Sequence, residues 1–194
     1  MIGQAAALIA ATIFCTAVFG AEPEHDPATR AEDMAEMATG SRVSAETPEW
    51  AQIHAEGPKS PQNASFYGPL PPEYVAYVVE VCEGYGLEPS IVFGIMQQES
   101  AFLPDVIGDN GRAIGIMQVQ PRWHADRMAR LGVTDLTDPY QAALVGCDFL
   151  AELLDTFGGS YQDALTYYRY GSLTVTGEDY AGTVMANAAA IRGE

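Results

Sequence analysis

Ile91-Val92-Phe93-Gly94-Ile95-Met96-Gln97-Gln98-Glu99-Ser100 is an apolar run that ends in a carboxylate. In a helix of 3.6 residues per turn, side chains four apart share a face, so Glu99 continues the stripe of Ile91 and Ile95. No lysine or arginine occurs in residues 60–111, so the sequence offers no nearby cation. Burial without a cation raises the pKa of a carboxyl group and keeps it protonated, as a general acid requires. The run predicts a core-facing helix with a candidate acid in its last turn.

A glutamate in the last turn of a helix is also commonly a solvated end residue, so the later segments matter. Glu99-Ser100 is followed by a turn at residues 108–111, then by Gly115-Ile116-Met117-Gln118, and much later by Tyr167-Tyr168-Arg169. In this order and spacing the segments resemble the catalytic domain of the soluble lytic transglycosylases. That lysozyme-like family cleaves the glycan strand of peptidoglycan. The resemblance covers about residues 72–192.

The resemblance implies a catalytic role for Glu99, which protonates the glycosidic oxygen between N-acetylmuramic acid and N-acetylglucosamine. The resulting carboxylate then takes the proton of the muramic C6 hydroxyl, and a 1,6-anhydro ring closes without water. The expected substrate-binding residues are Ser100, Gly115, Met117, Gln118, Tyr168 and Tyr180. Among them, the glycine lets backbone approach a ligand, the glutamine offers a donor and an acceptor, and Tyr168 is expected to hydrogen-bond near Glu99.

Two alternatives stay open. Asp105 and Asp109 follow the acid closely, and either could position a water, which would give a lysozyme-type peptidoglycan hydrolase. The second alternative is a non-catalytic peptidoglycan-binding or envelope-assembly module. Arg169 supports it, because the family usually has asparagine there and arginine is a longer cation without an acceptor.

The chain is strongly acidic, with 26 acidic against 9 basic residues and a formal net charge of −17. This balance argues against nucleic acid, which proteins bind largely through lysine and arginine. It is compatible with an exported monomer that binds a neutral sugar backbone. Four arginines gather after the acid, and they indicate either a solvated helix surface or a basic lip for peptide carboxylates: Arg112, Arg122, Arg127 and Arg130.

The first residues resemble an export signal. Residues 2–19 are mostly apolar and uncharged, and Val18 and Gly20 are small residues suited to cleavage after position 20. Because the preceding segment has no lysine or arginine, an uncleaved membrane anchor through residues 2–19 is the alternative. We therefore expect a signal peptide or anchor at 1–20, and a protein exported to the cell envelope or beyond.

Residues 21–71 are acidic and proline-rich, which predicts a disordered linker before a catalytic domain at 72–194. Helical periodicity begins at Pro72 and stops at the glycines around Tyr85. We expect further helices from Pro89 or Ser90 and at 122–131, 139–155, 160–169 and 177–191. The predicted fold class is a mainly α, lysozyme-like single domain with a small irregular or β lobe at residues 108–118.

Cys82 and Cys147 lie in predicted helices, where they can pack as small apolar groups or form a disulfide, and the sequence leaves both possibilities open. The three histidines are scattered, and no cluster has the spacing of a zinc site or a calcium loop. We therefore expect neither a metal nor a cofactor.

Overall fold

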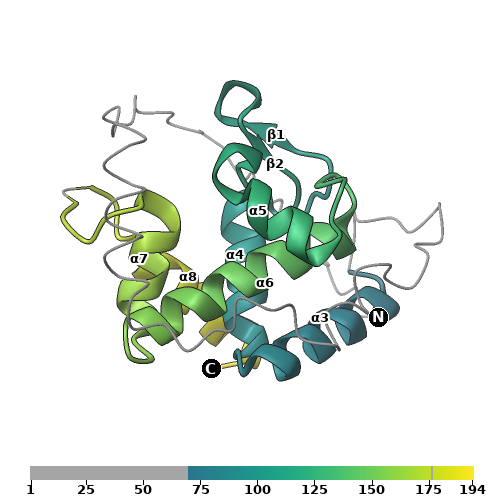
Figure 1. The fold of residues 1–194 in the computed structure, drawn as a ribbon. Coiled ribbons are helices and arrows are strands. Elements are labelled where there is room, and N and C mark those ends of the chain that lie inside the picture. Colours follow the sequence, from purple (N-terminus) through teal and green to yellow (C-terminus); the bar gives the residue numbers. More distant parts are fainter. Residues whose placement is uncertain (1–69, 176) are drawn as a thin grey trace, which may run out of the picture.

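The computed structural model describes residues 70–175 and 177–194 (Figure 1). The predicted signal or anchor at 1–20 and nearly all of the predicted linker at 21–71 lie outside these residues. The described part of the chain has six α-helices and a small lobe of two strands at one edge of the domain, which confirms the predicted α-rich fold class with its small lobe (Figure 1). In chain order the elements are α3 (Pro72–Tyr85), α4 (Pro89–Ser100), β1 (Ile107–Gly108), η1 (Asp109–Gly111), β2 (Ala113–Ile114), α5 (Pro121–Leu131), α6 (Pro139–Thr156), α7 (Tyr161–Tyr170) and α8 (Tyr180–Arg192).

Helix boundaries follow local signals that the sequence carries. Proline stands at the start of α3, α4, α5 and α6, where its missing N–H costs no helical hydrogen bond. Gly86 ends α3 in the left-handed conformation, with φ of 68°. The last helix begins at Tyr180, three residues later than predicted, because the carboxylate of Asp179 accepts a hydrogen bond from the backbone N–H of Gly182 and caps it.

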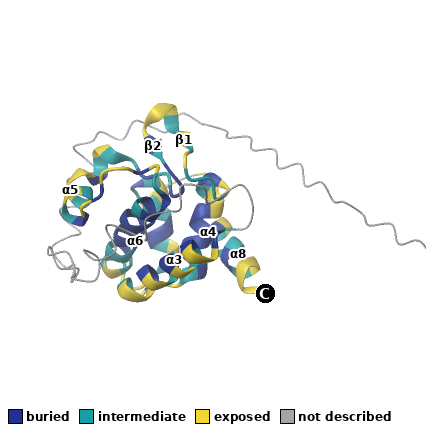
Figure 2. Ribbon diagram, turned by 90° about the vertical axis from the view of Figure 1, so that its right-hand side faces the viewer, coloured by how far each residue is buried: buried dark blue, intermediate teal, exposed yellow. Residues whose placement is uncertain are grey.

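Helix α4 is more deeply buried than its sequence suggests. Every residue from Ser90 to Met96 is buried, so its first two turns are enclosed on all sides rather than along one stripe. Gly94 allows this close packing, because a Cβ at that position would lie 2.7 Å from the backbone oxygen of Val184 in α8. The buried residues of α4 and α6 occupy the middle of the domain (Figure 2). The last turn of α4 emerges from this core and carries Glu99.

The end of α4 is abrupt. Ala101 and Phe102 follow Ser100 with φ of 51° and 65°, and their backbone N–H groups donate to the carbonyls of Gln97 and Met96. The helix therefore ends at Ser100, before it reaches Pro104. Non-glycine residues rarely adopt positive φ, and two in succession are typical of backbone that functional geometry constrains.

The small lobe is an antiparallel pair in which Ile107 lies opposite Ile114, and Gly108 opposite Ala113. A further bridge joins Ile114 to Val119 through hydrogen bonds in both directions, of 2.9 and 3.0 Å. Residues 115–118 thus form the tip of a second tight hairpin. Among the described helices, none is both long enough and apolar enough to cross a membrane.

Candidate active site

Glu99 lies in the last turn of α4, where the helix leaves the core, and it is partly buried. The hydroxyl of Tyr180 donates a hydrogen bond of 2.7 Å to its Oε1 atom. The carboxyl group is therefore held in a definite position by a second helix, and it is not the freely solvated end residue that the sequence left possible.

Tyr180 is the first residue of α8 and is only 5% exposed. Burial, followed by the charge of Glu99, raises the pKa of the Tyr180 hydroxyl well above its ordinary value of 10.0. The hydroxyl therefore stays protonated near neutral pH and can donate to the carboxylate. The close packing of α4 against α8 at Gly94 sets the relative position of the two side chains.

Ser100 is buried, and its hydroxyl lies 3.1 Å from the carbonyl oxygen of Met96 and 2.9 Å from that of Ile116. It therefore connects the end of α4 to the hairpin tip. Because this hydroxyl faces two protein carbonyls, the geometry favours a role in positioning the site over direct contact with a sugar.

Gly115 begins the hairpin tip with φ of +81°. A Cβ at this position would lie 2.0 Å from the carbonyl oxygen of Leu136, so no other residue fits without a backbone shift. Its N–H donates to the carbonyl of Val106 at 2.9 Å. The glycine is therefore required by a close approach within the protein itself, between the lobe and the segment before α6.

Met117 and Gln118 complete the tip. Met117 is fully buried, and its side chain occupies the space that a Cβ on Gly146 of α6 would fill. Gln118 has φ of 48°, and its Nε2 atom donates to the carbonyls of Val106 and Gly115 at 3.0 and 2.9 Å. Both side chains thus stabilise the wall of the lobe, and the partly buried Gln118 is the more accessible of the two.

Tyr168 of α7 lies near Glu99, whose charge, after burial, raises the pKa of the Tyr168 hydroxyl. The hydroxyl donates to the carbonyl of Met117 at 3.2 Å, and the ring packs against Phe149 with centroids 5.3 Å apart. Tyr168 thus binds the backbone of the hairpin tip near Glu99, and the hydroxyl that donates to Glu99 itself belongs to Tyr180.

The two alternative functions rest on Arg169, Asp105 and Asp109, whose surroundings the structure describes. Arg169 is exposed, and its charge acts on Tyr180 in the direction that lowers the pKa of that hydroxyl. Asp105 is exposed. Asp109 accepts hydrogen bonds from Arg112 at 2.5 Å and from Gln120 at 3.2 Å, so its carboxylate is engaged within the lobe.

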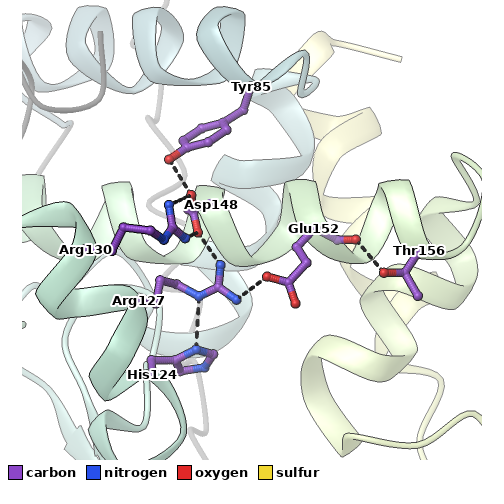
Figure 3. Close-up of polar contacts among 7 residues, drawn as sticks. All are labelled: Tyr85, His124, Arg127, Arg130, Asp148, Glu152 and Thr156. Carbon is purple, nitrogen blue, oxygen red and sulfur yellow. Dashed lines mark hydrogen bonds and ion pairs between the residues drawn. The ribbon is translucent and has the colours of Figure 1, made fainter. Parts of the chain in front are cut away.

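The sequence did not predict a buried ion cluster that joins α3 and α5 to α6 (Figure 3). Asp148 is fully buried and accepts hydrogen bonds from Tyr85, Arg127 and Arg130. Arg127 also donates to Glu152 at 2.7 Å. Arg127 and Arg130, expected either on a solvated helix surface or in a basic lip, thus point inward to Asp148. They do so because a buried carboxylate requires charged donors.

A signal for this cluster exists in the sequence. Asp148 interrupts the otherwise uncharged run 142–151 of α6, and such a residue predicts a buried cationic partner. The cluster reaches the site through aromatic contacts: the guanidinium of Arg127 lies 5.1 Å from the ring centre of Phe149, which packs on Tyr168. Within residues 70–175 and 177–194, no group of three or more histidine, cysteine, aspartate or glutamate side chains could hold a metal ion.

Comparisons with known proteins agree with this geometry. One solved structure, an inactive mutant of the lytic transglycosylase Slt from Pseudomonas aeruginosa, superposes with a TM-score of 0.52 over 59% of this chain and 23% of that one. At 23% identity this similarity supports the fold.

Three curated proteins are similar over parts of their length. Membrane-bound lytic murein transglycosylase C of Actinobacillus pleuropneumoniae serotype 5b (strain L20) is 38% identical over 92 residues, which are 44% of this chain and 25% of that protein. The protein named transglycosylase of Enterobacteria phage PRD1 is 34% identical over 109 residues, or 53% and 38% of the two chains. Invasion protein IagB of Salmonella typhimurium (strain SL1344) is 29% identical over 89 residues, or 43% and 55%.

The matched segment thus spans from a quarter to about half of these relatives. The model of the family described as the transglycosylase SLT domain matches residues 77–181, which are more than half of the chain and run from within α3 to the start of α8. This match includes Glu99, the hairpin tip and Tyr180. The chain therefore belongs to the transglycosylase SLT domain family.

Proposed function

We propose that this protein is a lytic transglycosylase that cleaves the β-1,4 bond between N-acetylmuramic acid and N-acetylglucosamine in peptidoglycan and leaves 1,6-anhydromuramic ends. The observation that carries the proposal is the carboxyl group of Glu99, partly buried at the end of a core helix and bound by the hydroxyl of Tyr180. A carboxyl group in this setting can both give and take a proton.

The reaction needs this one carboxyl group. Protonated Glu99 gives its proton to the glycosidic oxygen as the bond from that oxygen to the muramic C1 breaks. The C6 hydroxyl of the same sugar then attacks C1, and the Glu99 carboxylate takes the proton that this hydroxyl releases. The carboxyl group is regenerated, one bond is broken and one is formed, and no water is consumed. Tyr180 stabilises the carboxylate between the two steps through a charge-assisted hydrogen bond.

A hydrolase of the lysozyme type would need a second group to activate or position water. Asp109 is a poor candidate, because Arg112 and Gln120 already bind its carboxylate. Asp105 is exposed in the turn before β1. The arrangement of the two aspartates therefore favours the anhydro product over hydrolysis.

The remaining expected site residues form the frame of the substrate cleft in this proposal. Ser100 and Tyr168 connect α4 and α7 to the backbone of the hairpin tip, and Gly115 and Met117 shape that tip. Gln118, partly buried at the edge of the lobe, is the residue we assign to a direct sugar contact.

We further propose that the protein acts as a monomer in the cell envelope or outside the cell, and that residues 2–19 either direct export or anchor it in the membrane. The apolar, uncharged character of that segment supports this. The similarity of the chain to proteins named as murein transglycosylases agrees with a substrate in the cell envelope.

The test is a digest of purified peptidoglycan by the full chain, with the products analysed by mass spectrometry before and after borohydride reduction. Anhydro ends are lighter than hydrolysed ends by one water molecule, and they resist reduction. We expect anhydro-muropeptides. Reducible ends would indicate a hydrolase instead, and intact strands that still sediment with the protein would indicate a binding module.

A further inference from the structure

Helices α3 and α6 run side by side in the same direction. Three tyrosine hydroxyls of α3 reach α6 in succession: Tyr74 donates to the carbonyl of Pro139 at 3.3 Å, Tyr77 to that of Tyr140 at 3.1 Å, and Tyr85 to the carboxylate of Asp148 at 2.7 Å. The paired residues are separated by 65, 63 and 63 positions in the chain. This near-constant separation means that the two helices keep one register along their contact, and Figure 3 shows Tyr85 pointing across it at Asp148.

Cys82 and Cys147 fall into the same register. Cys82 lies in α3 between Tyr77 and Tyr85, and Cys147 directly precedes Asp148 in α6. Both side chains are 0% exposed, and both are free thiols. The Cys147 thiol is hydrogen-bonded to Cys82, and this contact, followed by burial, raises the pKa of that thiol well above its ordinary value of 9.0. The register and the thiol contact thus agree that the two sulfur atoms face each other across the interface.

We propose that Cys82 and Cys147 are a disulfide site, and that they form an intramolecular bond between α3 and α6 when the chain folds in the presence of a small-molecule disulfide. The bond forms by two exchange steps. One cysteine thiolate attacks the small disulfide and releases one thiol, and the second cysteine then attacks the mixed disulfide and releases the other. The two cysteines together lose two electrons and two protons, and the small disulfide is reduced to two thiols.

The position of this bond gives it a consequence for the rest of the domain. Everything between Cys82 and Cys147 would become one closed loop, which contains α4 with Glu99, the two-stranded lobe, the hairpin tip and α5. A cross-link that closes a loop of this length disfavours the unfolded chain. Because Tyr85 and Asp148 already hold the helices together beside the cysteines, the bond would reinforce an existing contact.

The burial of both thiols determines when oxidation can happen. In the folded, reduced protein the sulfur atoms have no access to a disulfide reagent, and the raised pKa of the Cys147 thiol keeps it in its unreactive form. We therefore expect oxidation during folding to be fast and oxidation of the already folded, reduced protein to be slow.

The experiment uses the full chain with Cys15→Ser, so that only the two helix cysteines remain. The protein is unfolded in denaturant under reducing conditions and refolded either with oxidised and reduced glutathione or with excess reductant. A non-reducing digest analysed by mass spectrometry should contain one peptide pair linked through Cys82 and Cys147 in the first sample only. Thermal unfolding of the cross-linked form should occur roughly 10 °C higher than that of the reduced form.

Cys82→Ala and Cys147→Ala, each in the same background, are the matched controls. Each variant is compared with itself under the two conditions, so any loss of packing cancels, and neither should show the rise in melting temperature. Two free thiols, mixed disulfides with glutathione, or disulfide-linked dimers after oxidative refolding would overturn the proposal. A linked pair without a rise in melting temperature would contradict its stabilising role.

Discussion

The Tyr180 hydroxyl and the Glu99 carboxylate lie 81 residues apart in the chain and 2.7 Å apart in the fold. The hydrogen bond between them joins the first residue of α8 to the last turn of α4. The two helices meet closely because Gly94 leaves room for the backbone of α8 at Val184. The packing of α4 against α8 thus sets the position of the proposed acid. The Glu99 side chain is held by the hydrogen bond from Tyr180, which a solvated glutamate at a helix end would lack.

Replacing Tyr180 by phenylalanine tests the importance of this hydrogen bond. Tyr180→Phe removes the donor and preserves the ring, so the carboxylate loses a charge-assisted hydrogen bond while the packing stays. We expect kcat to fall about 10- to 150-fold with little change in KM, because such a bond contributes about 1.5–3 kcal/mol. The measurement is the rate of anhydro-muropeptide release at several substrate concentrations.

The control is Tyr161→Phe, which removes a hydroxyl that accepts a hydrogen bond from the backbone N–H of Glu88, at the opposite end of α4 from Glu99. This variant should keep the wild-type kcat. Equal losses in the two variants would mean that Tyr180 acts through stability alone.

The hairpin tip should tolerate no side chain at Gly115. Gly115→Ala combines a strained φ of +81° with a clash against the carbonyl oxygen of Leu136. We expect the free energy of unfolding to fall by about 3 kcal/mol or more, from the left-handed conformation and overpacking together. Urea denaturation followed by circular dichroism measures it.

Gly111→Ala is the control that separates the cost of a positive φ from the cost of the clash with Leu136. Gly111 has a similar φ of +90°, but a Cβ there would meet nothing within 4 Å. This variant should lose only about 1–2 kcal/mol. If both variants lost the same stability, the close approach of Leu136 to Gly115 would have no energetic importance.

The ion cluster predicts how stability depends on pH. Burial alone would raise the pKa of Asp148, but the hydrogen bond from Arg130, the charge of Arg127 and the hydrogen bond from Tyr85 outweigh it, and the pKa lies below its ordinary value of 3.8. As the pH falls, the unfolded chain therefore binds this proton first. The contribution of Asp148 to stability is complete above pH 3.8 and is lost as the pH falls through its folded pKa.

Asp148→Asn isolates this contribution, because asparagine has no proton to gain. The wild type should be more stable than the variant at pH 7 and at pH 5, and the difference should shrink as the pH falls from about 4 toward 2. Urea denaturation of both proteins across this range gives the comparison. A difference that stays constant at acid pH would contradict the ionised, buried state of Asp148.

Local features of the chain could be predicted because they depend on neighbouring residues. The prolines that start α3, α4 and α6, and Gly86 at the end of α3, act within one helical turn. Glu99 could be proposed as the acid because the spacing between Glu99-Ser100 and the segment from Gly115 to Gln118 is specific to the family.

Other features depend on residues that meet only in the folded domain. The choice of Tyr180 over Tyr168 as the partner of Glu99 follows from how α7 and α8 pack against α4, which no local pattern encodes. The inward direction of Arg127 and Arg130 depends on Asp148, which lies 21 and 18 residues away.

The central claim is that Glu99 is the acid and base that releases anhydro ends, and its most direct test compares the wild type with Glu99→Gln on purified peptidoglycan. Glutamine has nearly the same shape and can still accept the hydrogen bond from Tyr180, but it cannot give and retake a proton. We predict that the release of anhydro-muropeptides falls by about 10²- to 10⁴-fold while the melting temperature and the binding to peptidoglycan are unchanged. Release at the wild-type rate by a folded Glu99→Gln protein would contradict the assignment.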